Sequence, residues 1–176
     1  MTNEEETIEN KVLNSALALI DPETFYPESE IVGFDIKPYL FMEMILKEKD
    51  FREALKNIDW KQYEGKGVYI YCSADTIIPF WAYMLVASYL SPLTDKYVFG
   101  DKERLIEALM LENIKKTDFS IYKGKKMLIK GCSADDKPVP ASIYVEISRI
   151  LLPIANSLMY GEACSNVPIF KLGKKL

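Results

Sequence analysis

The chain has 176 residues, of which 49% are hydrophobic and 27% are charged, as in a soluble globular protein long enough to bury a core. The net charge of -4 argues against a nucleic-acid surface, and the absence of histidine excludes Ser-His-Asp triads, Cys-His nucleophile pairs and HExxH zinc sites. Three cysteines are too few for a disulfide scaffold. We therefore expect a reduced, cytoplasmic protein that does not span a membrane.

The first third of the chain, residues 1–64, is predicted to form an N-terminal α/β extension. Residues 16–20 have a pattern that fits either a helix or a strand, and residues 31–36 alternate as a strand does. The largely apolar residues 39–45 fit either a helical turn or a strand, and we favour the helix. Residues 47–58 are predicted to form an amphipathic helix, because their apolar residues recur at helical spacing among charges.

The rest of the chain contains one tetrapeptide twice, Cys72-Ser73-Ala74-Asp75 and Cys132-Ser133-Ala134-Asp135. Each copy follows a Gly-Lys pair and a strand-like run. Each is followed by proline, a helix-like run, and a closing apolar run that ends in aromatic-Gly-acid. This common order of features predicts an internal duplication of a βαβ unit over residues 65–101 and 124–162.

The two copies differ in the helix that they contain. The helix predicted over residues 141–155 has a charged face, whereas the one over residues 80–90 is apolar nearly all round. A helix that is apolar nearly all round is normally buried on both sides. We therefore expect the N-terminal segment or a second subunit of a homodimer to cover the helix 80–90. The remaining predicted elements are the strands 68–71, 96–99, 127–130, 157–160 and 167–170 and the helix 102–112.

Together these patterns predict a single α/β domain over residues 1–176. Its sheet is expected to be mixed and partly parallel, and to be built from the two repeated βαβ units after the N-terminal α/β extension. In a βαβ unit the loop after a strand's carboxyl end faces the usual ligand crevice. Both Cys-Ser-Ala-Asp loops have that position, and this makes them the candidate site.

Sulfur and carboxylate ligands at this spacing suit zinc, ferrous iron or an iron–sulfur cluster. The predicted metal-ligating residues are Cys72, Cys132, Cys164, Asp75, Asp135 and Glu162. Two alternatives stay open. In the first, the cysteines are structural and are buried as small hydrophobic residues, and the aspartates cap the helices that follow. A thiol near a helix N-terminus also suits redox or sulfur-transfer chemistry. No catalytic residue is predicted.

Several runs of the sequence resemble a bacterial family known as domain of unknown function 2480. The resemblance covers nearly the whole chain and is carried by residues 46–52, 71–75, 81–84, 98–101, 130–132 and 159–165. Genes of this family often lie near those of sulfur-mobilisation (SUF-type) cluster assembly. The resemblance therefore implies an accessory role in handling iron, sulfur or clusters, with iron–sulfur assembly proteins as partners, and it implies no defined activity.

Three hypotheses of function follow from these observations. The first is a metal- or iron–sulfur-associated accessory protein that uses the three cysteines. The alternatives are a non-enzymatic interaction or dimerisation module with structural cysteines, and a thiol-based sulfur-transfer or redox protein. None of the three involves nucleic acid or a membrane.

Overall fold

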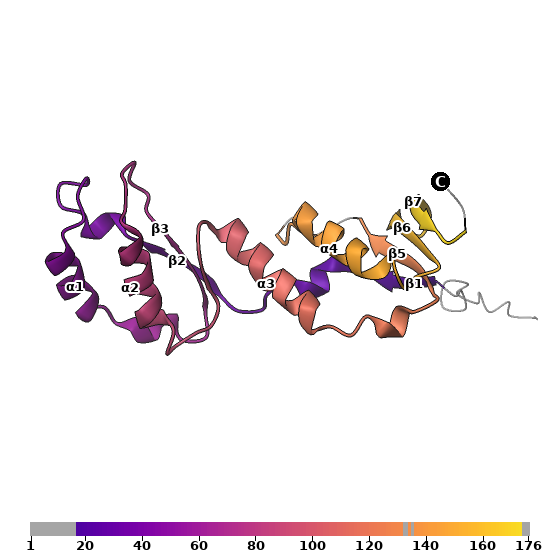
Figure 1. Cartoon of the computed structure of the whole chain (residues 1–176), viewed down its shortest axis with the longest axis horizontal. Helices are drawn as coiled ribbons and strands as arrows, with labels where there is room; N and C mark the ends of the chain where they lie inside the picture. Colours follow the sequence, from indigo (N-terminus) through magenta and orange to yellow (C-terminus); the bar gives the residue numbers. More distant parts are fainter. Residues whose placement is uncertain (1–16, 132–133, 135, 174–176) are drawn as a thin grey trace, which may run out of the picture. The chain divides into compact units, whose positions relative to one another are not determined.

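The computed structural model describes residues 17–131, 134 and 136–173. The chain divides into two compact units (Figure 1). Unit 2 comprises Tyr26–Asn113, and unit 1 comprises the residues before and after it. No helix within the described ranges is long and apolar enough to cross a membrane.

Unit 2 is built on a three-stranded parallel sheet in the order β2-β3-β4. Its register places Phe34, Ile70 and Phe99 side by side. Parallel strands need crossover connections, which two helices supply here. The elements of this unit are β2 (Ile31–Asp35), η2 (Lys37–Tyr39), α1 (Glu48–Lys56), η3 (Trp60–Tyr63), β3 (Gly67–Tyr71), α2 (Phe80–Leu90) and β4 (Tyr97–Phe99).

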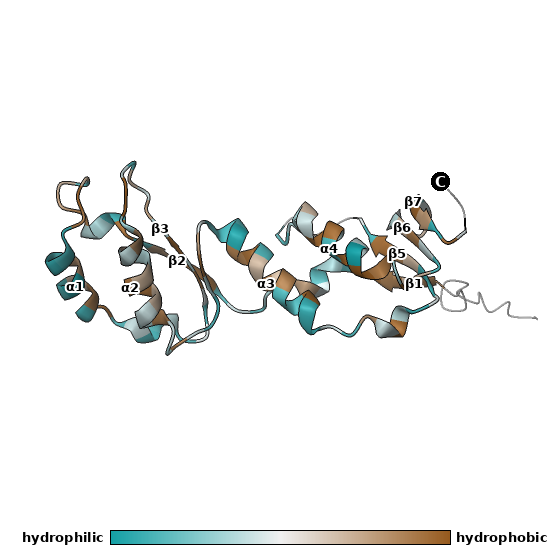
Figure 2. Ribbon diagram, in the orientation of Figure 1, coloured by the Kyte–Doolittle hydropathy of each residue, from teal (hydrophilic) through white to brown (hydrophobic). Residues whose placement is uncertain are grey.

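The core of unit 2 lies between one face of the sheet and the apolar sides of α1 and α2. Alternate residues of β3, Val68 and Ile70, are buried on one face of the sheet, and α1 buries Phe51 and Leu55 one turn apart. Helix α2 buries residues at the same spacing, namely Ala82, Val86 and Leu90. All of these side chains belong to one cluster, so both helices cover the same face of the sheet (Figure 2).

Unit 1 contains a mixed four-stranded sheet in the order β1-β5-β6-β7. The first three strands are parallel, and β7 returns antiparallel to β6 in a hairpin. Its elements are β1 (Leu17–Ile20), η1 (Pro22–Phe25), η4 (Ser120–Tyr122), β5 (Lys126–Lys130), α4 (Ala141–Leu151), β6 (Ser157–Glu162) and β7 (Ser165–Lys171). The remaining helix, α3 (Lys102–Lys116), begins in unit 2 and ends in unit 1.

The mixed α/β class predicted from the sequence is confirmed, with the strands divided between two sheets. Of residues 16–20, the described part, Leu17–Ile20, is a strand, since β1 pairs parallel with β5. The helix expected over residues 39–45 is wrong. Phe41 and Ile45 form an antiparallel bridge there, and Met42 and Glu43 have positive φ angles of 51° and 57°. The single-domain organisation and the internal duplication stay predictions.

Candidate functional site

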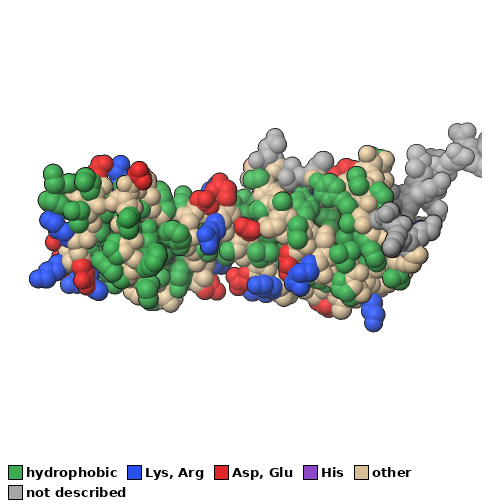
Figure 3. Space-filling model, turned by 45° about the horizontal axis from the view of Figure 1, so that its top comes forward, with side chains coloured by type: hydrophobic (Ala, Val, Ile, Leu, Met, Phe, Trp, Pro, Cys, Tyr) green, Lys and Arg blue, Asp and Glu red, His purple; other side chains and the backbone are tan. Residues whose placement is uncertain are grey.

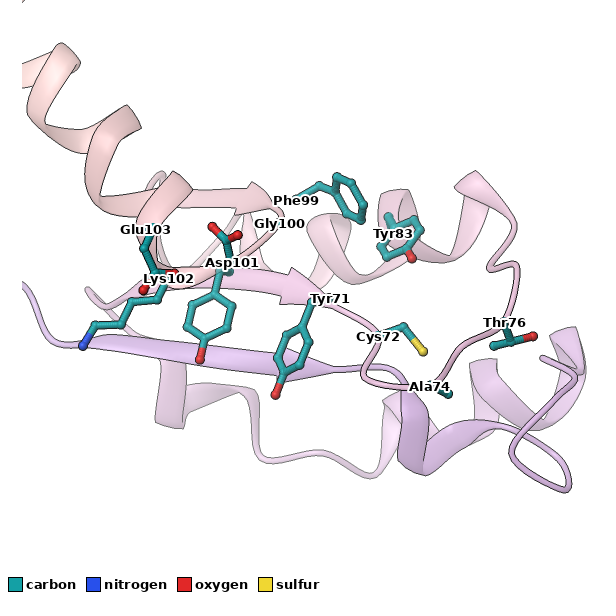
Figure 4. Close-up of a pocket in the computed structure, with 11 residues that line it drawn as sticks. Tyr71, Cys72, Ala74, Thr76, Tyr83, Phe99, Gly100, Asp101, Lys102 and Glu103 are labelled. Carbon is teal, nitrogen blue, oxygen red and sulfur yellow. The ribbon is translucent and has the colours of Figure 1, made fainter. Parts of the chain in front are cut away.

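Cys72 follows β3 directly, at the carboxyl end of the parallel sheet of unit 2, and its side chain is half-buried. It lines an open cleft of about 470 Å³ (Figure 4). Ligands of parallel α/β sheets bind at this edge. The cleft is lined by Tyr69, Tyr71, Cys72, Ala74, Thr76, Tyr83, Phe99, Gly100, Asp101, Lys102 and Glu103.

Aromatic rings form much of the wall of this cleft. Tyr69 and Tyr71 of β3 are in contact with a centroid distance of 5.3 Å, and Tyr83 of α2 meets Phe99 of β4 edge-on at 4.8 Å. Figure 4 shows the Tyr83 hydroxyl pointing toward the Cys72 thiol. Burial and the charge interaction with Cys72 raise the pKa of Tyr83, so at neutral pH this phenol is protonated and can donate a hydrogen bond.

Asp35, at the end of β2, holds the Cys72 loop (residues 72–75) in place. Its Oδ1 accepts hydrogen bonds from the Ser73 amide at 3.0 Å and the Lys37 amide at 2.9 Å. Its Oδ2 accepts the Ser73 hydroxyl at 2.5 Å. Burial alone would raise the pKa of Asp35, but these bonds and the charge of Lys37 together lower it. The carboxylate therefore stays ionised and keeps its three acceptor bonds.

Directly after the Cys72 loop, the chain contacts a second loop of the same unit. The Thr76 hydroxyl donates to the Met44 carbonyl at 2.7 Å. Asp75, predicted as a metal ligand, is exposed and does not line the cleft. Cys72 and Asp75 thus share one loop, while the thiol lines the cleft and the carboxylate lies outside it.

The second Cys-Ser-Ala-Asp loop belongs to unit 1. Cys132 and Asp135, both predicted ligands, lie outside the described residues. Ala134 is described, and its amide donates to Glu23 Oε1 at 2.7 Å. Glu23 also lies 3.7 Å from Lys130 Nζ, which bonds Asp21 at 2.8 Å. In both units, an acidic residue at or shortly after the end of the first strand therefore contacts the Cys-Ser-Ala-Asp loop.

The two remaining predicted ligands lie in the β6–β7 hairpin. Glu162 ends β6, and Cys164 is exposed in the turn before β7. Within the described ranges, no three or more Cys, Asp or Glu side chains form a group that could hold a metal ion. The six-residue metal site stays a prediction, because two of its members are outside those ranges.

A second feature of unit 2 is an exposed apolar surface formed by α2 and the residues just before it, which we call the α2 surface. Its members Ile77, Phe80 and Met84 are 94%, 85% and 71% exposed, and Phe99 of β4 lies at its rim. Figure 2 shows strongly hydrophilic residues on α1 that α2 lacks. Hydrophobic side chains also gather over unit 2 on the face shown in Figure 3. The sequence predicted that this helix would be covered on both sides, but the structure of the single chain leaves one side open.

The chain matches the family described as protein of unknown function (DUF2480) over residues 6–172. It belongs to this family. The resemblance carried by the sequence motifs is thereby confirmed for nearly the whole chain. The DUF2480 description states no activity, so function has to be argued from the chain's own residues. No curated protein and no solved structure matches the chain.

Two important residues of the site were not among the predicted site residues. Asp35 is 38 positions from Ser73, and only the pairing of β2 with β3 brings the two together. Tyr83 lies on a helix whose apolar residues predicted burial in the core or in a dimer interface, and no ligand site. The one available indication for Asp35 was an acidic residue near the end of a predicted strand, because the carboxyl ends of parallel strands form the ligand edge of the sheet.

Proposed function

We propose that this protein is a non-enzymatic interaction module and that the α2 surface of unit 2 binds its partner. The observation that carries the proposal is the exposure of Ile77, Phe80 and Met84 on a segment without charge. From Thr76 to Thr94 the chain contains no Asp, Glu, Lys or Arg.

A helix at the surface of a monomer normally presents charged residues to water, as α1 does through Glu48 and Arg52. Fully burying a Phe or Met side chain gains about 1.5–3 kcal/mol. A face that leaves Phe80 and Met84 in water therefore forgoes stability that a partner would recover.

A photo-crosslinking amino acid placed at position 84 in living cells tests the proposal. We expect a discrete crosslinked product, because Met84 lies within the surface that the partner covers. The matched control places the same amino acid at Lys49, an exposed position of α1 in the same unit, and we expect no discrete product there. Equal or absent crosslinking at the two positions would contradict the proposal.

A second candidate is a metal- or iron–sulfur-associated accessory protein that uses Cys72, Cys132 and Cys164 with Asp75, Asp135 and Glu162. It is favoured by the position of the Cys72 thiol in an open cleft, where Asp101 and Glu103 also lie. Partly exposed thiols at such a place can bind metal or take up sulfur. A sulfur-transfer or redox role for the same thiol stays a prediction from the sequence.

Metal and sulfide analysis of protein purified without oxygen tests this second candidate. Stoichiometric iron with sulfide, lost on replacing Cys72 by serine, would support a cluster role. Zinc alone would support a zinc site. Metal content that stays the same after each single cysteine replacement would exclude these cysteines as ligands.

A further inference from the structure

We infer that the partner of the α2 surface is a second copy of this chain, so that α2 forms the centre of a homodimer interface. This inference rests on the proposed interaction role and names its partner. Four observations carry it: the lack of charge on α2, its satisfied polar groups, the comparison with α4, and the area that the surface offers.

The chain has a net charge of -4, so two copies repel one another over most of their surfaces. In a two-fold dimer the same patch meets itself, and any charge in the patch then faces a like charge. The segment from Thr76 to Thr94 is free of charges and brings none into such a contact. The α2 surface is therefore suited to meeting its own copy.

Helix α2 also has an exposed ridge of side chains that suits packing against another helix. Phe80, Met84 and Ser88 are all exposed and follow one another at four-residue spacing, which forms the kind of ridge that packs into the groove of another helix. Ser88 is small, and its hydroxyl already donates to the Leu85 carbonyl at 2.6 Å. Covering this ridge would therefore leave no serine hydroxyl without a hydrogen bond.

Helix α4 of unit 1 can be compared with α2 of unit 2. Tyr144 of α4 meets Tyr160 of β6 edge-on at 5.6 Å, as Tyr83 meets Phe99 in unit 2. Beside the pair in unit 1 lies a groove of about 420 Å³ to which Ile169 of β7 contributes a wall.

Unit 2 has no counterpart of that wall in the part of the chain that the structure describes, because no strand there pairs with the outer edge of β4. Helix α4 also presents an ion pair, Glu146 with Arg149 at 2.6 Å, whereas α2 has no charged residue. Of the two comparable helices, α2 is thus the one whose outer face is both uncovered and uncharged.

The α2 surface offers much of the area that a dimer interface needs. With large apolar side chains offering roughly 150–200 Å² each, the exposed fractions of the α2 surface amount to about 500 Å². This is more than half of the ~800 Å² that each partner buries in a standard-size interface.

Analytical ultracentrifugation of the purified full chain tests the inference. We expect the unmodified chain to be a dimer, and we expect the double variant Phe80→Glu, Met84→Glu to be monomeric. Four carboxylates brought together across a two-fold axis should raise the dissociation constant by at least ~100-fold. The matched control is Val145→Glu, a charge at an exposed position of α4, which should leave the dimer intact.

Circular dichroism shows whether each variant is folded, and Phe80→Ser provides a milder change that should weaken the dimer without adding charge. A wild-type chain that is monomeric at all concentrations, or a dimer that persists in the folded double variant, would overturn the inference. A monomeric chain that still crosslinks through position 84 to a different protein would remove the second copy as partner and leave the interaction role standing.

Discussion

Replacing Asp35 by alanine would remove the contact that ties β2 to the Cys72 loop. Three hydrogen bonds are lost: those from the Ser73 amide, the Ser73 hydroxyl and the Lys37 amide. Hydrogen bonds contribute about 1 kcal/mol each to stability, and somewhat more when one partner is charged. Because the loop is partly solvated, water replaces some of what is lost. We expect a loss of about 2 kcal/mol in the free energy of unfolding at pH 7.

The effect should depend on pH in a defined direction. Although burial opposes ionisation, the hydrogen bonds from Ser73 and Lys37 hold the pKa of Asp35 below its ordinary value. A carboxyl group with a lowered folded-state pKa stabilises the fold above its unfolded pKa of about 3.9, and this stability is lost as the pH falls through the folded value. The difference between the wild type and Asp35→Ala should therefore be full at pH 7 and shrink below about pH 4.

Urea denaturation followed by tryptophan fluorescence measures this difference, because both tryptophans, Trp60 and Trp81, lie in unit 2 with Asp35. The control variant Ser73→Ala keeps the two amide bonds and should lose less stability than Asp35→Ala. Equal stability of Asp35→Ala and wild type at pH 7, or a difference that is the same at pH 7 and pH 3, would refute the reasoning.

Three further predictions concern the core, the hairpin and the thiols. Leu55→Ala should lower the free energy of unfolding by about 2–5 kcal/mol in the same fluorescence assay, because Leu55 is fully buried. Gly161→Ala should cost at least ~1 kcal/mol in thermal unfolding, because Gly161 has a φ of +124° and a Cβ there would lie 2.6 Å from the Ser165 carbonyl oxygen. The exposed Cys164 should be alkylated faster than the half-buried Cys72, as peptide mass spectrometry would show; equal rates would contradict their difference in exposure.

Most helices and strands could be predicted because the spacing of their apolar residues in the sequence matches the spacing of their buried residues in the structure. Buried residues alternate in β3, and α1 and α4 bury one stripe each. The error at residues 39–45 has a physical cause. Phe41 and Ile45 are apolar but exposed, and the backbone turns through positive φ angles at Met42 and Glu43. Hydrophobicity alone does not distinguish such a turn from a buried helix.

The candidate site was predictable only in part. The repeated tetrapeptide led to Cys72, which lies at the predicted edge of a parallel sheet. Asp35 and Tyr83 could not be assigned, because strand pairing brings the first to the Cys72 loop and helix packing places the second beside it. Contacts of this kind depend on register, which a single sequence does not determine.

The two units share more contacts than the repeated sequence runs suggested. Asp59 accepts a bond from the amide two residues on, and Asp118 does the same in unit 1. The amides of Gly65 and Gly124, both at positive φ, donate to carbonyls shortly after α2 and α4 respectively. These contacts lie before the strands and extend the similarity toward the N-terminal side of each copy. The duplication stays a prediction, yet the shared contacts make each unit a reference for the other.

Against that reference, the differences between the units are the most informative features of the chain. Unit 1 has a β7 strand beside β6 and charges on α4, whereas α2 has no charges and the described residues add no strand outside β4. Features that only hold a fold together would be expected in both units. Both α2 and α4 carry exposed apolar side chains, but of the two only α2 has no charged residue, so we attribute the α2 surface to binding and not to the stability of the single chain.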